Sequence, residues 1–204
     1  MTGLVVDPAT YSRAVGWEAG KMLCADFLKL NGLRPVQFVD MSSRPRFRQG
    51  PGAFGYYRSG MVRVNVARTA LPQRGKPIRA WSYSGWKSDR TAPGVTAHEV
   101  GHHVDQELQE PSSSVQLDRV TGYSAVHPEE AWAEAVRVFI LNPDLLRSLF
   151  PRSYKALVDC GLRPIVDLTW QQVLVHAHPR YHELALKNTK PFDSKHVYHS
   201  GGRI

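Results

Sequence analysis

The pentapeptide His98-Glu99-Val100-Gly101-His102 constrains the fold of this chain more than any other feature of its sequence. Residues four positions apart lie on one face of an α-helix, so a helix brings both imidazoles to the same side. Pro93-Gly94 is expected to interrupt the chain just before the motif. The sequence therefore predicts a helix that begins near Val95 or Thr96 and ends at about Leu108.

The segments around this helix predict a chain of the α+β class. Apolar residues recur at helical spacing in some segments and alternate in others. The elements that we expect are helices at 11–30 and 129–141, a strand at 36–39, a hairpin at 53–66 that turns at Ser59-Gly60, and three shorter helices between 145 and 187. This order of helix, strands and then helices differs from a run of βαβ units.

The length of 204 residues predicts a single domain with a sizeable core. We expect residues 1–93 to hold the first helix and a β-rich part. Residues 94–190 are expected to hold the motif helix and a mostly helical remainder. Residues 191–204, which include Ser200-Gly201-Gly202, are expected to form a loose tail.

The charge balance is basic, with 26 Lys and Arg against 18 Asp and Glu and a net charge of +8. Such a surplus predicts weak binding to nucleic acid or to acidic surfaces. The basic residues are scattered, however, and the densest group is Arg44, Arg46 and Arg48. No zinc-finger, RRM-like or basic-helix pattern accompanies them.

Targeting signals and cysteines add little to this description. The first ten residues lack a basic start and a long apolar run, and no segment has the roughly 20 apolar residues of a membrane span. We therefore expect a soluble protein in the cytoplasm as synthesised, without a membrane partner. Cys24 and Cys160 form no metal pattern, and we expect two small buried side chains, although the sequence leaves open whether they pair.

The spacing of the motif suits a metal centre. Two neutral imidazoles on one helix face can bind one Zn²⁺ ion, and zinc lowers the pKa of a water molecule toward neutrality. Glu99 follows the first imidazole and is the candidate general base that takes the proton of that water. A catalytic zinc also needs a third protein ligand and one open position.

The third ligand has several candidates in the sequence. His103 is adjacent to His102 and points about 100° away around the helix, so it does not share the ligand face. Glu130 and Glu134 lie four residues apart beside an apolar helix face, where one could bind the metal and the other could orient a histidine. The other candidates are Asp105, His127, Glu129 and the pair His176 and His178.

The two helices together resemble a known family. His98-Glu99-Val100-Gly101-His102-His103-Val104-Asp105, followed by Glu130-Ala131-Trp132-Ala133-Glu134-Ala135, is similar to the gluzincin metallopeptidases related to the anthrax lethal factor catalytic domain and the Pro-Pro endopeptidases. The resemblance covers roughly residues 94 to 141. It implies that Glu130 is the third zinc ligand and that Glu134 is a supporting carboxylate behind it.

The same resemblance implies further roles. The family has a tyrosine seven residues before the ligand glutamate, which here is Tyr123, and its hydroxyl would stabilise the oxyanion of the tetrahedral intermediate. Asp105 lies along the same side of the helix, three residues after His102, where it would fix a ligand histidine, cap a neighbouring strand or be an exposed residue at the helix end. A zincin-like fold places a small mixed sheet beside the active-site helix, and its edge strand docks the substrate. The hairpin at 53–66 is the candidate for that edge.

The function that follows is a zinc-dependent endopeptidase acting on a peptide or protein substrate. The alternative is a phage or virion-associated protein, or a nucleic-acid-binding protein, with a structural or vestigial metal site. Small basic proteins with this motif and no signal peptide also occur in phage genomes, which adds virion association or non-classical export to the expected destinations. The sequence leaves the cleavage-site preference, the oligomeric state and the physiological metal open.

Overall fold

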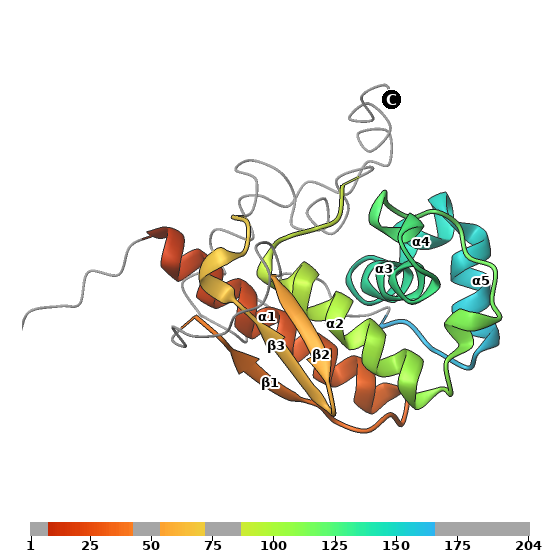
Figure 1. Cartoon of the computed structure of the whole chain (residues 1–204), viewed down its shortest axis with the longest axis horizontal. Helices are drawn as coiled ribbons and strands as arrows, with labels where there is room; N and C mark the ends of the chain where they lie inside the picture. The colour runs from red at the N-terminus through yellow and green to blue at the C-terminus, as the bar shows by residue number, and fades with distance from the viewer. Residues whose placement is uncertain (1–7, 43–53, 72–86, 166–204) are drawn as a thin grey trace, which may run out of the picture.

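Helix α2 (Ala92–Glu107) lies between a small sheet and a group of C-terminal helices (Figure 1). A computed structural model of the chain describes residues 8–42, 54–71 and 87–165. The described elements are α1 (Pro8–Leu30), β1 (Gln37–Asp40), β2 (Gly55–Arg58), β3 (Met61–Val64), the 3₁₀ turns η1 (Val66–Arg68), η3 (Pro111–Ser113) and η4 (Tyr123–Ala125), and the helices α2, α3 (Pro128–Leu141), α4 (Pro143–Leu149) and α5 (Pro151–Asp159). The described part is a mixed α+β structure that is mostly helical, as the sequence predicts.

The sheet has the strand order β1-β3-β2, with β1 parallel and β2 antiparallel to β3. A two-residue turn joins β2 to β3, and both of its residues, Ser59 and Gly60, have positive φ of 49° and 74°. That backbone matches the right-handed twist of a tight hairpin. The predicted hairpin and its turn are therefore confirmed. Strand β2 lies at the edge of the sheet on the side of α2 (Figure 1).

Buried apolar side chains from the sheet and from all five described helices form one connected core. Val62 and Val64 of β3 are fully buried, as their alternation in the sequence predicts. Phe27 of α1 meets Phe139 of α3 edge to face, with ring centroids 6.2 Å apart. The core thus holds α2 in place from the sides of α1, the sheet and α3.

The start of α2 differs from the sequence-based expectation. The helix begins at Ala92, so Pro93 and Gly94 lie inside its first turn and do not interrupt it. Proline fits there because the first N–H groups of a helix have no intrahelical partner. Thr91 caps the helix, and its hydroxyl accepts a hydrogen bond from the N–H of Gly94 at 3.3 Å.

The remaining expectations are met in part. Helices α3, α4 and α5 agree with the predicted helical remainder as far as residue 165. The predicted tail at 191–204, the Arg44–Arg48 cluster and the pair His176 and His178 lie outside the described residues. Cys24 is buried and Cys160 is half-buried, and both are free thiols. None of the helices in the described ranges has the length and apolar character needed to cross a membrane.

Candidate metal centre

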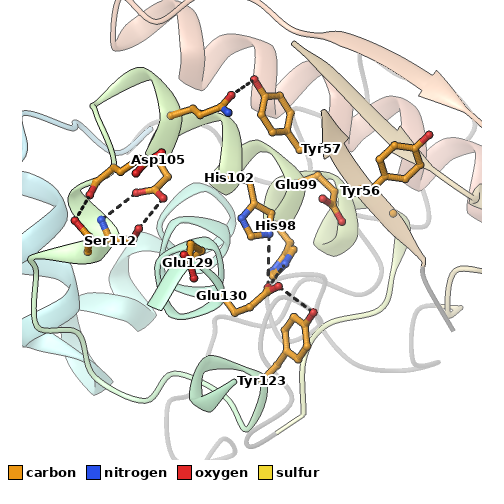
Figure 2. Close-up of a pocket in the computed structure, with 14 residues that line it drawn as sticks. Tyr56, Tyr57, His98, Glu99, His102, Asp105, Ser112, Tyr123, Glu129 and Glu130 are labelled. Atoms are coloured by element: carbon orange, nitrogen blue, oxygen red, sulfur yellow. Dashed lines mark hydrogen bonds and ion pairs between the residues drawn. The ribbon is translucent and has the colours of Figure 1, made fainter. Parts of the chain in front are cut away.

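Helices α2 and α3 bring the side chains of His98, His102 and Glu130 together (Figure 2). The two imidazoles lie one turn apart on α2, with ring centroids 5.0 Å apart, and Glu130 lies in the first turn of α3. Nε2 of His98 is 3.0 Å and Nε2 of His102 is 3.6 Å from Oε2 of Glu130. Three ligand atoms therefore lie within 4.8 Å of one another, close enough to bind a single ion.

The close contact of the two helices depends on Gly101. A Cβ atom at this position would lie only 2.6 Å from Cα of Ala133 on α3, so any larger residue would push the helices apart. Gly101 sits between the two histidines on the chain, and Ala133 is one turn beyond Glu130. The glycine of the motif thus permits the distance at which the third ligand reaches the first two.

The donor set fits a metal ion. Nδ1 of His98 lies 2.9 Å from Oε1 of Glu134, and donation of that N–H to the carboxylate leaves Nε2 with its lone pair toward Glu130. Oε2 of Glu130 is buried, and it accepts no hydrogen bond although both Nε2 atoms are near. Lone pairs that converge without protons between them are satisfied by a cation, and imidazole and carboxylate are ligands of divalent metals.

The pKa values of His98 and Glu130 reflect how close these side chains lie to each other. Burial lowers the pKa of His98, but the carboxylates of Glu130 and Glu134 outweigh it and raise that pKa to about 10. Burial raises the pKa of Glu130, but the two histidines outweigh it and hold the pKa well below its usual range. The two shifts show that the imidazoles and the carboxylates attract one another across the group.

Glu99 lies against the edge strand beside this group. Its side chain is 6% exposed, and a Cβ atom on Gly55 of β2 would come within 2.9 Å of its Oε1. Burial raises the pKa of Glu99, while the two histidines and a hydrogen bond from the backbone N–H of Tyr57 act in the opposite direction. The result is a buried carboxylate of increased basicity next to the candidate ligands.

Tyr123 approaches the group from the turn η4. Its hydroxyl donates a hydrogen bond to Oε1 of Glu130 at 3.1 Å, and its ring centroid is 5.7 Å from that of His98. Tyr123 is 44% exposed and also lines the cavity beside the ligand group, and its ring lies next to Glu130 (Figure 2). Burial, followed by the charge of Glu130, raises the pKa of Tyr123 to about 12, so the phenol keeps its proton at neutral pH.

Asp105 and His103 do not join the ligand group. The carboxylate of Asp105 accepts hydrogen bonds from the N–H of Ser112 at 3.0 Å and from its hydroxyl at 2.7 Å, and so closes the turn after α2. His103 faces away from the ligands, as its position on the helix predicts. Its Nε2 lies 2.8 Å from the carbonyl oxygen of Arg34, and its Nδ1 lies 3.0 Å from the hydroxyl of Tyr57.

A cavity of about 470 Å³ opens beside the ligand group. Strand β2 forms one wall with Gly55, Tyr56 and Tyr57, and the end of α2 with the following turn forms another (Figure 2). Its lining includes several carboxylates but no Lys or Arg among the described residues, although the chain has a net charge of +8. The basic surplus therefore lies outside this part of the molecule.

Sequence reasoning missed the residues that hold Glu134 in place. Arg137, Thr121 and Ser88 all contact its carboxylate. Arg137 lies three residues after Glu134 on the same helix, and that spacing could have indicated the pair. Thr121 and Ser88 come from loops, and no periodicity in the sequence connects either residue with Glu134.

Comparisons of the chain with protein-family models, with curated proteins and with solved structures give no match. The resemblance to gluzincins thus rests on the motifs alone.

Proposed function

We propose that the chain is a zinc-dependent endopeptidase of gluzincin type with a zincin-like fold. The observation that carries this proposal is the meeting of three ligand atoms, from His98, His102 and Glu130, beside the buried carboxylate Glu99 and β2, the edge strand of the sheet in the described residues. Two imidazoles and one carboxylate form a ligand set that catalytic zinc sites use, and such sites keep one position open. The cavity next to the group supplies the space for a substrate.

A bound zinc ion would polarise a water molecule and the carbonyl group of the substrate. Glu99 is placed to accept the proton of the attacking water and to deliver it to the leaving amine. Its burial and its hydrogen bond from the N–H of Tyr57 fix the carboxylate against β2, so the base is held in one position. Glu134 fixes the ring of His98 and directs its Nε2 toward the metal position.

Tyr123 supplies a hydrogen-bond donor on the open side of the site. In the peptidase mechanism its hydroxyl turns from Oε1 of Glu130 to the oxygen of the substrate on which negative charge develops. A phenol with a raised pKa is protonated at neutral pH and so remains a donor.

Strand β2 provides the docking edge for an extended peptide. The N–H of Asn65 donates to the carbonyl of Phe54, and pairs in an antiparallel ladder alternate, so the peptide groups of Gly55 point away from β3. Gly55 also lines the cavity, and its peptide groups are therefore accessible to a substrate backbone. The edge strand and the ligand group together favour a peptide as the substrate.

The decisive experiment combines zinc analysis with the variant Glu99→Gln. We expect one zinc per chain in the parent and in the variant, and hydrolysis of a peptide library only by the parent, with a loss of about 10²- to 10⁴-fold in the variant because the general base is removed. Glu107→Gln is the matched control, since Glu107 lies on the same helix but pairs with Arg34 at the surface. A Glu99→Gln protein that cleaves as well as the parent would contradict the mechanism.

The same preparation also tests the alternative function. A parent that holds zinc, hydrolyses no peptide in the library and binds DNA with strongly salt-dependent affinity would favour a nucleic-acid-binding protein with a structural metal. A parent that retains no zinc after reconstitution would contradict the metal centre itself.

A further inference from the structure

Glu134 is surrounded by more hydrogen-bond donors than a histidine partner needs. Its side chain is 1% exposed. Oε1 lies 2.9 Å from Nδ1 of His98 and 3.0 Å from Nε of Arg137. Oε2 accepts from Nη2 of Arg137 at 3.0 Å, from the hydroxyl of Thr121 at 2.6 Å and from that of Ser88 at 3.1 Å. Every direction of the carboxylate is therefore fixed.

The charge of this carboxylate is fixed as well. Burial raises the pKa of Glu134, but Arg137 and His98 outweigh it and hold the pKa well below its usual range. Arg137 is fully buried, and its fork binds both oxygens. Arg137 thus balances the charge of the carboxylate, and the hydroxyl groups of Thr121 and Ser88 orient it.

Thr121 differs from the other partners because it also belongs to the turn that carries Tyr123. Its side chain is fully buried. Its backbone N–H donates to the hydroxyl of Ser124 at 3.1 Å, and its carbonyl accepts from the N–H of Ser124 at 3.2 Å. This reciprocal pair closes the turn around Tyr123, while the hydroxyl of Thr121 reaches across to Glu134 on α3.

We propose that Thr121 is a positioning residue that couples the two halves of the site: it orients His98 through Glu134, and it holds the turn that presents Tyr123. A hydroxyl has one proton to donate, and the donation to Oε2 of Glu134 places the start of η4 at a fixed distance from α3. The positions of the His98 ring and of the Tyr123 phenol therefore both depend on Thr121. This inference rests on the proposed metal centre and extends it.

Zinc affinity tests the first half without any assay of turnover. The variant Thr121→Val keeps the shape of the side chain and removes the donor, whereas Thr121→Ser keeps the donor. We expect Thr121→Val to weaken zinc binding by about tenfold, measured by competition with a chelator, because residues that support a ligand histidine contribute at that level. Thr121→Ser is expected to restore most of the affinity.

The control variant is Thr69→Val. Thr69 is also buried, at 1% exposure, and its hydroxyl also donates a short hydrogen bond, to the carbonyl of Val66 at 2.7 Å, but it does not line the cavity. We expect a loss of stability comparable with that of Thr121→Val and an unchanged zinc affinity. This comparison separates the loss of a buried hydroxyl from the loss of positioning.

Double-variant cycles test the two routes of coupling. In a Glu134→Gln background, Thr121→Val is expected to cause little further loss of zinc affinity, because its effect passes through that carboxylate. In zinc-saturated protein, Thr121→Val is expected to lower kcat, and to lower it less in a Tyr123→Phe background.

The outcomes are distinct. If the parent binds zinc and Thr121→Val binds it equally well, the inference is overturned while the proposed function stands. An equal loss of affinity in Thr121→Val and Thr69→Val overturns it too, since the effect would then be one of general stability. If the parent itself binds no zinc, the proposed function fails, and the inference fails with it. Loss in Thr121→Val with rescue in Thr121→Ser supports the coupling.

Discussion

Helix α2 meets a neighbouring helix through a glycine on each of two sides, and one of these contacts lies beside the candidate metal ligands. On the side of α1, a Cβ atom at Gly20 would lie 2.9 Å from Cα of Pro93. On the side of α3, a Cβ atom at Gly101 would lie 2.6 Å from Cα of Ala133. Both distances are too short for a real Cβ atom, so the close approach of two helices does not by itself make a site.

The difference lies in the side chains one turn away from each contact. Near Gly20, the neighbours on α1 include the buried apolar residues Trp17 and Leu23, which belong to the core. Near Gly101, the neighbours His98 and Glu130 present lone pairs toward a common point. A glycine contact therefore sets a distance between helices, and the residues that flank it decide whether that distance serves packing or ligand binding.

Substitution of the two glycines is expected to have the largest effect on the protein. We expect Gly101→Ala to destabilise the protein by about 1–3 kcal/mol or more, because the new methyl group meets backbone atoms of Ala133. We also expect it to abolish measurable zinc binding, since Glu130 moves away from the histidines. Chemical denaturation of the metal-free protein and chelator competition measure the two effects.

Gly20→Ala is the matched variant on the other side of α2. It meets backbone atoms of Pro93 and is expected to cost a similar amount of stability. Zinc affinity is expected to stay near that of the parent. A comparable loss of zinc binding in both variants would show that the ligand group responds to the packing of α2 in general, and the distinction between the contacts would then fail.

The two carboxylates of α3, Glu130 and Glu134, are expected to differ in their effects on zinc affinity and on stability. Glu134→Gln removes the carboxylate that accepts from two nitrogens of the buried Arg137, so we expect a loss of about 3–5 kcal/mol in the unfolding free energy of the metal-free protein. Its zinc affinity is expected to fall by about ten- to a hundredfold. Glu130→Gln is expected to lose more zinc affinity and less stability, because Glu130 is the partly exposed one of the pair.

Titration with zinc measures the affinity of both variants, and denaturation measures their stability. Glu130→Gln is expected to lose more affinity, and Glu134→Gln is expected to lose more stability. If Glu134→Gln loses more zinc affinity than Glu130→Gln, then Glu134 and not Glu130 is the direct ligand, and the assignment based on the geometry is wrong.

Much of this arrangement could be predicted from local patterns. The positions of α1, α3 and the hairpin follow from apolar spacing and from the pair Ser59-Gly60, since these signals act within a few residues. The meeting of His98 with His102 follows from helical geometry. That Glu130 joins them was implied by the resemblance, and the structure brings its carboxylate to the imidazoles.

The rest depends on contacts between distant segments. The start of α2 was misplaced because Pro93 and Gly94 are typical of a break, whereas Thr91 caps the helix and the carboxyl group of Asp89 leaves no room for a side chain at position 94. Two partners of Glu134, Ser88 and Thr121, come from loops 46 and 13 residues away along the chain, where no periodicity applies. Asp105 had several expected partners, and only the fold brought Ser112 to it.

The first turn of α2 makes another close contact, between Gly94 and Asp89. This contact is expected to affect how the stability of the protein depends on pH, and its effect is the smallest of those considered. A Cβ atom at Gly94 would lie 2.3 Å from the carboxyl carbon of Asp89, which is 8% exposed and accepts from the N–H of Thr91 at 2.9 Å. Burial raises the pKa of Asp89 from 3.8 to about 6, although Arg137 and the hydrogen bonds from Thr91 act in the opposite direction. Asp89 is thus a buried titratable residue that does not belong to the candidate metal ligands.

The variant Asp89→Asn removes the charge and keeps an oxygen that can accept from Thr91. The folded protein binds the proton of Asp89 more tightly than the unfolded chain does, so this group lowers the unfolding free energy as pH rises from about 4 to about 6. Relative to the parent, Asp89→Asn is therefore expected to gain stability across that range, by up to about 3 kcal/mol, which corresponds to the shift in pKa. Denaturation of parent and variant at pH 4 and pH 7 measures the gain, and zinc affinity at pH 7 is expected to be unchanged. A difference in stability that is independent of pH would show that Asp89 ionises as readily in the folded protein as in the unfolded chain. A change in zinc affinity would show that the contact between Gly94 and Asp89 is coupled to the candidate metal ligands.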